Sequence, residues 1–233
     1  MTAAPELVLP VPPHVNGRPT RIIQLDLPTL ANSSLLSPFA KMVLAAFKVS
    51  YRQPYIAPDF PRLESDEQIL HELKPDVIIF LLTPVDDPET VLASVAAHPY
   101  HATSPEELKQ MHPFALKWLV QPSEEDPQMP RWALKQLCVS PEAQRNGLAG
   151  WLLNLADSVI RQVVTQRKKD PNVQDVTEAC DGAKMLLSTT KELNGTFYAK
   201  RGWRITGERM AAPGYMGSEG GFTIVLMERN ISL

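Results

Sequence analysis

The chain has 233 residues, of which 44% are hydrophobic and 21% charged, and it carries a formal net charge of −3 with a pI of about 6.0. This is the composition of an ordinary globular protein. A nucleic-acid partner is not indicated, because the net charge is negative and no basic run is longer than Arg167–Lys169.

Cysteine content and hydropathy set the expected compartment. Two cysteines, Cys138 and Cys180, are too few for a disulfide framework, which favours a reducing environment. Prolines interrupt the apolar residues near the N-terminus, so a signal peptide is not predicted. The longest apolar run, Val77–Leu82, is too short to cross a bilayer. We therefore expect a cytoplasmic protein that is not bound to a membrane.

The first half of the chain predicts strands and short helices separated by prolines. Residues 1–18 are expected to form an N-terminal arm, and residues 19–233 a single domain with an insertion at 98–130. The expected elements are a strand Arg21–Leu27, a helix capped by Ser37 before Pro38, a short helix from a capping box at Ser65–Gln68 to Leu73, and a hairpin of Asp76–Leu82 and Glu89–Ala97. Within the insertion, a helix is predicted from Ser104 to about Val120.

The second half contains the clearest helix of the sequence. Its apolar residues recur every three or four positions: Leu148, Trp151, Leu152, Leu155, Val159, Ile160 and Val163. The other expected elements are strands at Trp132–Val139, Met185–Thr189, Trp203–Met210 and Gly221–Arg229, and a short helix at Leu193–Lys200. This order predicts an α/β (α+β) fold with a mixed, mostly antiparallel central sheet flanked by helices.

The stretch Val139–Trp151 joins the predicted strand Trp132–Val139 to this helix through a loop with Gly147 and Gly150. Backbone N–H groups at the start of a helix point outward and bind anions, phosphates above all. The loop is not a Walker A motif, because no Gly-Lys-Ser/Thr follows, and it is not the G-x-G-x-x-G dinucleotide fingerprint.

Two motifs resemble one known family. Gln144-Arg-Asn-Gly-Leu-Ala149 resembles the Gln/Arg-x-x-Gly-x-Gly/Ala motif of the GNAT (GCN5-related) N-acetyltransferases, and Phe197-Tyr-Ala-Lys-Arg-Gly-Trp203 resembles the family's Phe-Tyr-x-x-x-Gly-Phe segment. The order and spacing of the two motifs also agree with the family. The resemblance implies the GNAT fold, and it implies acetyl-CoA (coenzyme A) as co-substrate.

The resemblance also implies the site residues. The loop would hold the pyrophosphate, and the strand before it would pair with the pantetheine amides. The implied cofactor-binding residues are Leu137, Cys138, Val139, Gln144, Arg145, Asn146, Gly147, Leu148, Ala149, Gly150 and Asn194. The family often has an asparagine seven residues before the tyrosine, where this chain has Lys191. Tyr198 takes the place of the family's proton donor to the leaving thiolate. No metal site is predicted, since the spacing of His98, His101 and His112 does not suit one.

The expected reaction is transfer of an acetyl group to an amine, by direct attack in a ternary complex. A small-molecule amine is the expected acceptor, and the insertion and the loop Tyr51–Pro61 are expected to shape its pocket. The general base is not identified: Asp59, Glu208 and Glu219 are acidic residues near the candidate regions, and a water chain is the other alternative. Two other functions remain open: an inactive acyl-CoA-binding regulatory protein and a protein-modifying acetyltransferase. The oligomeric state, monomer or homodimer, is also left open.

Overall fold

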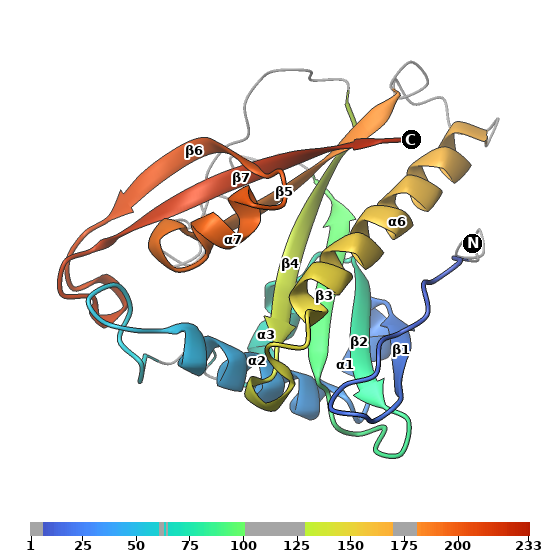
Figure 1. The fold of residues 1–233 in the computed structure, drawn as a ribbon, viewed down its shortest axis with the longest axis horizontal. Coiled ribbons are helices and arrows are strands. Elements are labelled where there is room, and N and C mark those ends of the chain that lie inside the picture. Colours follow the sequence, from blue (N-terminus) through green and yellow to red (C-terminus); the bar gives the residue numbers. More distant parts are fainter. Residues whose placement is uncertain (1–6, 61–62, 64, 101–128, 170–180) are drawn as a thin grey trace.

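The computed structural model describes residues 7–60, 63, 65–100, 129–169 and 181–233. One seven-stranded sheet organises them, in the order β1-β2-β3-β4-β5-β7-β6 (Figure 1). The strands are β1 (Thr20–Leu25), β2 (Ile78–Pro84), β3 (Ala93–Pro99), β4 (Arg131–Val139), β5 (Gly182–Thr190), β6 (Arg204–Ala211) and β7 (Phe222–Ser232). All neighbouring strands are antiparallel except β4 and β5, so the predicted mixed, mostly antiparallel sheet is confirmed.

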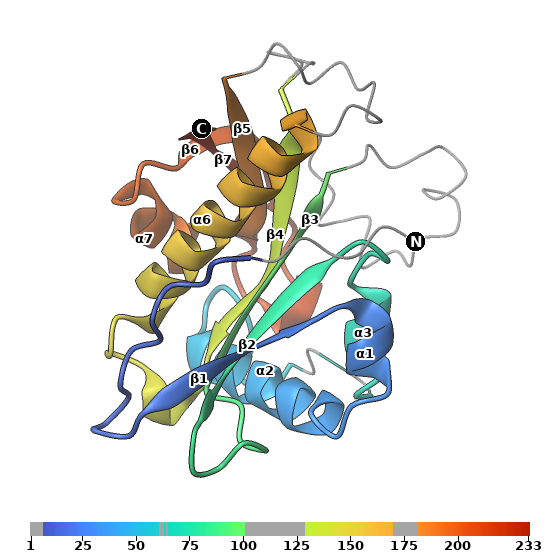
Figure 2. The same cartoon turned by 90° about the vertical axis from the view of Figure 1, so that its right-hand side faces the viewer.

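Helices cover both faces of this sheet, as Figure 2 shows most directly. The helical elements are α1 (Leu27–Ala31), α2 (Leu36–Ser50), α3 (Gln68–His71), the 3₁₀ turns η1 (Pro141–Ala143) and η4 (Tyr215–Gly217), α6 (Leu148–Lys169), the π-helical turn η3 (Lys191–Gly195) and α7 (Thr196–Ala199). The apolar residues of α6 and Tyr198 of α7 pack in one core cluster, and those of α1, α2 and α3 pack in another. The sheet is therefore the middle layer of three.

The long helix was predicted correctly from its periodicity. The face of α6 that includes Leu148, Leu152, Leu155, Val159 and Ile160 is buried against odd-numbered residues of β3, β5 and β7. Burial of a leucine or isoleucine side chain of this kind stabilises a fold by about 1.5–3 kcal/mol. The basic end of α6, Arg167–Lys169, suits the negative end of the helix dipole.

Several predicted boundaries were wrong in the first half of the chain. The strand expected at Arg21–Leu27 ends at Leu25, because the Asp26 side chain accepts a hydrogen bond from the Thr29 N–H and starts α1. Ser37 does not cap α2, which begins one residue earlier at Leu36. The predicted capping box before α3 is absent from the described residues, and Glu67 precedes the helix without a side-chain cap.

The predicted hairpin exists but lies two or more residues further along. β2 continues to Pro84, and β3 starts at Ala93 and reaches Pro99. His98 is therefore a strand residue and not part of the insertion. The predicted helix from Ser104 to Val120 lies outside the described residues, as does Cys180.

The helix expected at Leu193–Lys200 was also wrong in detail, since the chain forms the π-helical turn η3 and then the four-residue helix α7.

Part of the N-terminal arm is described. The backbone of Val8 exchanges two hydrogen bonds, each 2.8 Å, with the Gln162 side chain of α6, and Figure 2 shows this segment running beside that helix.

Candidate functional site: an open strand edge beside an anion-binding loop

β4 and β5 pair over a short length only. Each strand has nine residues, yet the pairing is confined to Arg131–Ala133 of β4 and Lys184–Leu186 of β5. Beyond Ala133 the two strands part, and Figure 1 shows them diverging toward the end where β4 meets η1. β4 continues to pair with β3 and β5 with β7. Over residues 134–139, the backbone edge of β4 that faces β5 therefore pairs with no described strand.

A bulge bends β4 within this unpaired length. The register with β3 shifts between Ser94 and Ala96, and Gln136 takes a positive φ of 48°. The Ser94 hydroxyl donates a 2.7 Å hydrogen bond to the Gln136 carbonyl, and the Gln136 amide donates one of 2.6 Å to Glu72. Such bulges re-aim the residues that follow them. Here those residues are Leu137, Cys138 and Val139, and the buried Cys138 forms no disulfide with the residues that the structure describes.

The loop after β4 supplies a row of backbone N–H groups. Arg145 and Gly147 both have positive φ, 66° and 76°, and α6 begins at Leu148. Among the described residues, no acceptor is found for the N–H groups of residues 145–150, and the next N–H, of Trp151, bonds to Gly147. A Cβ on Gly147 would meet nothing within 4 Å, so a glycine is favoured there by its φ and not by space. Free N–H groups at the start of a helix are the kind of donors that favour an anion.

Two predicted side chains hold this loop instead of facing outward. The Gln144 amide donates to the Val139 carbonyl at 3.3 Å. The Asn146 amide lies within 3.2 Å of the carbonyls of Ala143 and Gln144 and of the Asn16 side chain in the N-terminal arm. Leu148 is buried in the core. The Gln144 N–H bonds to the Pro141 carbonyl at 3.4 Å, so the free N–H groups begin at Arg145, whose side chain is exposed at the loop surface.

Arg201 is a residue at this loop that sequence reasoning did not single out. A Cβ placed on Gly150, in the first turn of α6, would lie 3.5 Å from Nη2 of Arg201. The guanidinium is held there by the Phe197 carbonyl, 3.0 Å from Nη1, and by the Phe197 ring, whose centroid is 3.8 Å from Cζ. A cation beside a helix N-terminus is unfavourable unless an anion joins it. In the sequence, the only feature that could have indicated Arg201 is its position three residues after Tyr198.

Tyr198 lies on α7 and is one of the buried residues of the α6 cluster. Its side chain is 9% exposed and meets the rings of Phe197 and Trp203 edge-on, at 5.0 and 5.8 Å. Burial raises the pKa of its phenol, and the Cys138 thiol raises it further. The phenol is therefore protonated at neutral pH and can donate a proton. Tyr198 of α7 and Cys138 of β4, two predicted site residues, therefore lie within range of each other's electrostatic influence.

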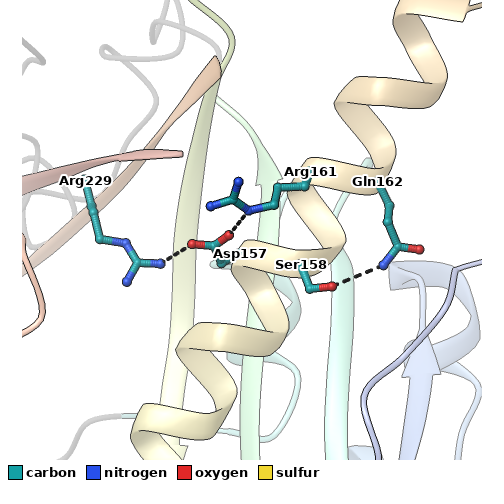
Figure 3. Close-up of polar contacts among 5 residues, drawn as sticks. All are labelled: Asp157, Ser158, Arg161, Gln162 and Arg229. Carbon is teal, nitrogen blue, oxygen red and sulfur yellow. Dashed lines mark hydrogen bonds and ion pairs between the residues drawn. The ribbon is translucent and has the colours of Figure 1, made fainter. Parts of the chain in front are cut away.

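An ion network joins α6 to β7 and reaches Tyr198 through the Trp203 ring. Asp157 of α6 pairs with Arg161 one turn along and, at 2.5 Å, with Arg229 of β7, as Figure 3 shows. The Arg229 guanidinium also lies 5.6 Å from the centre of the Trp203 ring, which contacts Tyr198. The chain of contacts runs from α6 through β7 to the tyrosine.

Asn194 lies in η3, the turn that follows β5. Its amide donates a 3.1 Å hydrogen bond to the Thr189 hydroxyl and so holds the η3 turn. Lys191, which stands where the family motif has asparagine, pairs with Glu208 at 2.7 Å on the surface.

The candidates for a general base are all exposed. Glu208 is paired with Lys191, and Asp59 and Glu219 are surface residues. The loop Tyr51–Pro61, expected near the acceptor, meets the connection around Tyr215, because Ala57 N–H bonds to the Met216 carbonyl and Glu219 N–H to the Pro54 carbonyl, both at 3.0 Å. Residues 101–128 of the insertion, the other segment expected there, lie outside the described residues. Within the described ranges, no group of three or more His, Cys, Asp or Glu side chains could hold a metal ion. No helix in those ranges has the length and apolar content to cross a bilayer.

Solved structures share this architecture. An aminoglycoside 6'-N-acetyltransferase complexed with coenzyme A superposes with a TM-score of 0.51 at 14% identity, over 91% of this chain and 98% of that one. The chain has an N-acetyltransferase fold. The aminoglycoside 6'-N-acetyltransferase from Enterococcus faecium gives a TM-score of 0.50 at 14% identity, over 91% of this chain and 98% of its own. The ribosomal-protein-S18-alanine N-acetyltransferase from Escherichia coli gives 0.48 at 14% identity, over 92% and 95%.

No protein-family model matches the sequence, and no curated protein matches it. The resemblance to the GNAT N-acetyltransferases is thus confirmed for the fold, while the activity rests on the site itself.

Proposed function

We propose that this chain is an N-acetyltransferase that moves the acetyl group of acetyl-CoA to an amine. The observation that carries the proposal is the unpaired edge of β4 directly before the cradle of free N–H groups at residues 145–150. Coenzyme A needs both features, because its pantetheine arm carries amides that pair with a strand edge and its pyrophosphate needs N–H donors. Coenzyme A bound to an acetyltransferase of this fold supports the proposal.

Each part of the site has its own role in this proposal. The N–H groups of the loop and the first turn of α6 bind the pyrophosphate, with Arg201 beside them. The backbone of Leu137, Cys138 and Val139 pairs with the pantetheine amides, and one N–H there stabilises the oxyanion formed when the amine attacks the thioester. Tyr198 protonates the thiolate that leaves.

A small-molecule amine is the acceptor we propose, and the loop Tyr51–Pro61 and the connection around Tyr215 are proposed to contact it. Their mutual hydrogen bonds support a common surface at this end of the sheet. In this proposal the protein acts in the cytoplasm without nucleic acid or membrane.

The proposal is tested by binding and by turnover. Calorimetry should detect acetyl-CoA, and S-acetylpantetheine, which has no phosphates, should bind at least about a hundredfold more weakly, a difference of about 2.7 kcal/mol. Release of free thiol is then followed with a panel of alkylamines, arylamines, amino acids and aminoglycosides. Equal affinity for the two thioesters would remove the cradle from the proposal, and acetyl-CoA binding without turnover of any amine would contradict the enzymatic part.

A further inference from the structure

His98 of β3 is a buried histidine with a defined tautomer. The ring is 5% exposed, and its Nδ1 lies 2.8 Å from the carbonyl oxygen of Pro99. A carbonyl oxygen can only accept a hydrogen bond, so Nδ1 carries the proton. In the neutral ring Nε2 then holds the lone pair. Nε2 is buried and has no hydrogen-bond partner among the residues that the structure describes.

The environment keeps this ring neutral. Burial lowers the pKa of His98 below its ordinary value of 6.5, and the charges of Lys135 on β4 and Lys74 before β2 lower it further. The Pro99 carbonyl and Asp76 act in the opposite direction but do not reverse the shift. At neutral pH the ring is therefore uncharged, and Nε2 is a free proton acceptor.

His98 is placed where β4 and β5 part. It lies directly opposite Ala133, and Ala133 forms the last pair between β4 and β5 with Leu186. The side chains of Val95 and Ala97 pack in the α6 cluster and Ala96 packs in the α2 cluster, so by alternation His98 faces the side opposite α6. Tyr198 packs on the α6 side. A proton acceptor beside the start of the parting and a proton donor thus lie on opposite faces of the sheet.

A purely structural role explains this arrangement poorly. A buried polar atom without a partner costs about 1–3 kcal/mol, and Nε2 has none among the described residues. Asp59, Glu208 and Glu219, by contrast, are exposed. Among the described residues, His98 combines burial, neutrality and a free lone pair beside the parting.

We propose that His98 is the general base of the acetyl transfer, an inference that rests on the proposed function. Nε2 takes a proton from the acceptor ammonium, directly or through one water. The neutral amine attacks the thioester carbon, the C–N bond forms, and the C–S bond breaks as Tyr198 protonates the thiolate. The amide nitrogen then gives its extra proton back to Tyr198, and His98 releases its proton to solvent. The products are the acetylated amine, coenzyme A and one proton.

The variant that tests this is His98→Gln, which keeps a polar side chain but cannot titrate. With an alkylamine acceptor we expect kcat to fall about a hundredfold or more. The wild-type kcat should fall at acid pH, with a midpoint below pH 6.5 because the pKa of His98 is lowered. In the variant this acidic limb of the pH profile should disappear. With an arylamine, which is already unprotonated at neutral pH, the loss should be much smaller. The control is His71→Gln, an exposed histidine of α3, which should change neither profile.

Equal losses of kcat with the two acceptors in His98→Gln, or an unchanged acidic limb, would overturn the role of His98. The proposed function would still stand, because the wild-type chain turns over an amine. Failure of the wild-type chain to turn over any amine would overturn both. One measurement needs no acceptor. Long-range ¹H–¹⁵N spectra of the wild-type protein at pH 7 should show His98 neutral and protonated on Nδ1. A ring protonated on Nε2 would overturn the inference whatever the kinetics of the variant.

Discussion

The guanidinium of Arg201 lies against Gly150, where a Cβ would come within 3.5 Å of its Nη2. This contact joins the end of the α7 segment to the first turn of α6, and it places a fixed positive charge beside the free N–H groups of the cradle. A Cβ on residue 150 would only be in ordinary van der Waals contact with the cation, and Phe197 holds the cation in place.

Arg201→Gln is therefore expected to weaken acetyl-CoA binding about tenfold, or by about 1.4 kcal/mol, because one charge beside the phosphates is lost. The loss should shrink at high ionic strength, since the side chain is exposed and its field is screened. Calorimetric titration at two salt concentrations measures both effects. Lys200→Gln removes the same charge one residue away and serves as the control. Equal losses in the two variants would show a general charge effect and no specific contact.

Tyr198→Phe should lower kcat about 10²- to 10⁴-fold because the thiolate then leaves without a proton donor. The ring contacts with Phe197 and Trp203 do not involve the hydroxyl, so the affinity for acetyl-CoA should change little. Steady-state thiol release and calorimetry on the same preparation separate the two quantities. Turnover near that of the wild type would remove Tyr198 from the proposed role.

The buried phenol also predicts a pH dependence of stability. The pKa of Tyr198 is raised above its ordinary value of 10.0. Below pH 10 the folded and unfolded chains are both protonated at this residue, and its contribution to stability is complete. Above pH 10 the unfolded chain loses this proton first, so the free energy of unfolding falls by up to about 1.4 kcal/mol per pH unit. Urea titrations from pH 9 to 11 should show a steeper fall for the wild type than for Tyr198→Phe. Parallel curves would contradict the burial of the hydroxyl.

Asp157 is expected to contribute to stability through Arg229. Both side chains are less than a fifth exposed, at 18% and 17%, and their oxygen and nitrogen are 2.5 Å apart. Asp157→Asn should lower the free energy of unfolding by about 2 kcal/mol, because Arg229 then keeps a partly buried charge without a counter-charge. Arg161→Gln, whose side chain is 41% exposed, should cost less than about 1 kcal/mol in the same denaturant titration. A larger effect of Arg161 would show that the surface pair dominates.

The elements that were predicted correctly are those that local sequence patterns determine. The apolar spacing from Leu148 to Val163 fixed α6, and the two glycine-containing motifs indicated the loop and the α7 segment. The caps at Ser37 and Ser65 were wrong because the packing of α2 and α3 overrode short-range preferences. The positive φ of Gln136 had no signal, since glutamine rarely adopts it. The contacts of Arg201, and the position of His98 at the end of β3, depend on strands and helices that are distant in sequence.

The three residue pairs between β4 and β5 have a mechanical consequence. In the part of the chain that the structure describes, they form the one hydrogen-bonded seam between an antiparallel half sheet β1-β2-β3-β4 and another, β5-β7-β6. A molecule that bonds to the edge of β4 while its phosphates bind at α6 would stiffen this seam. Hydrogen exchange should therefore slow at residues 134–139 when acetyl-CoA is added, while the amides inside each half sheet change little. Among the contacts between the described strands, we expect this seam to deform most easily.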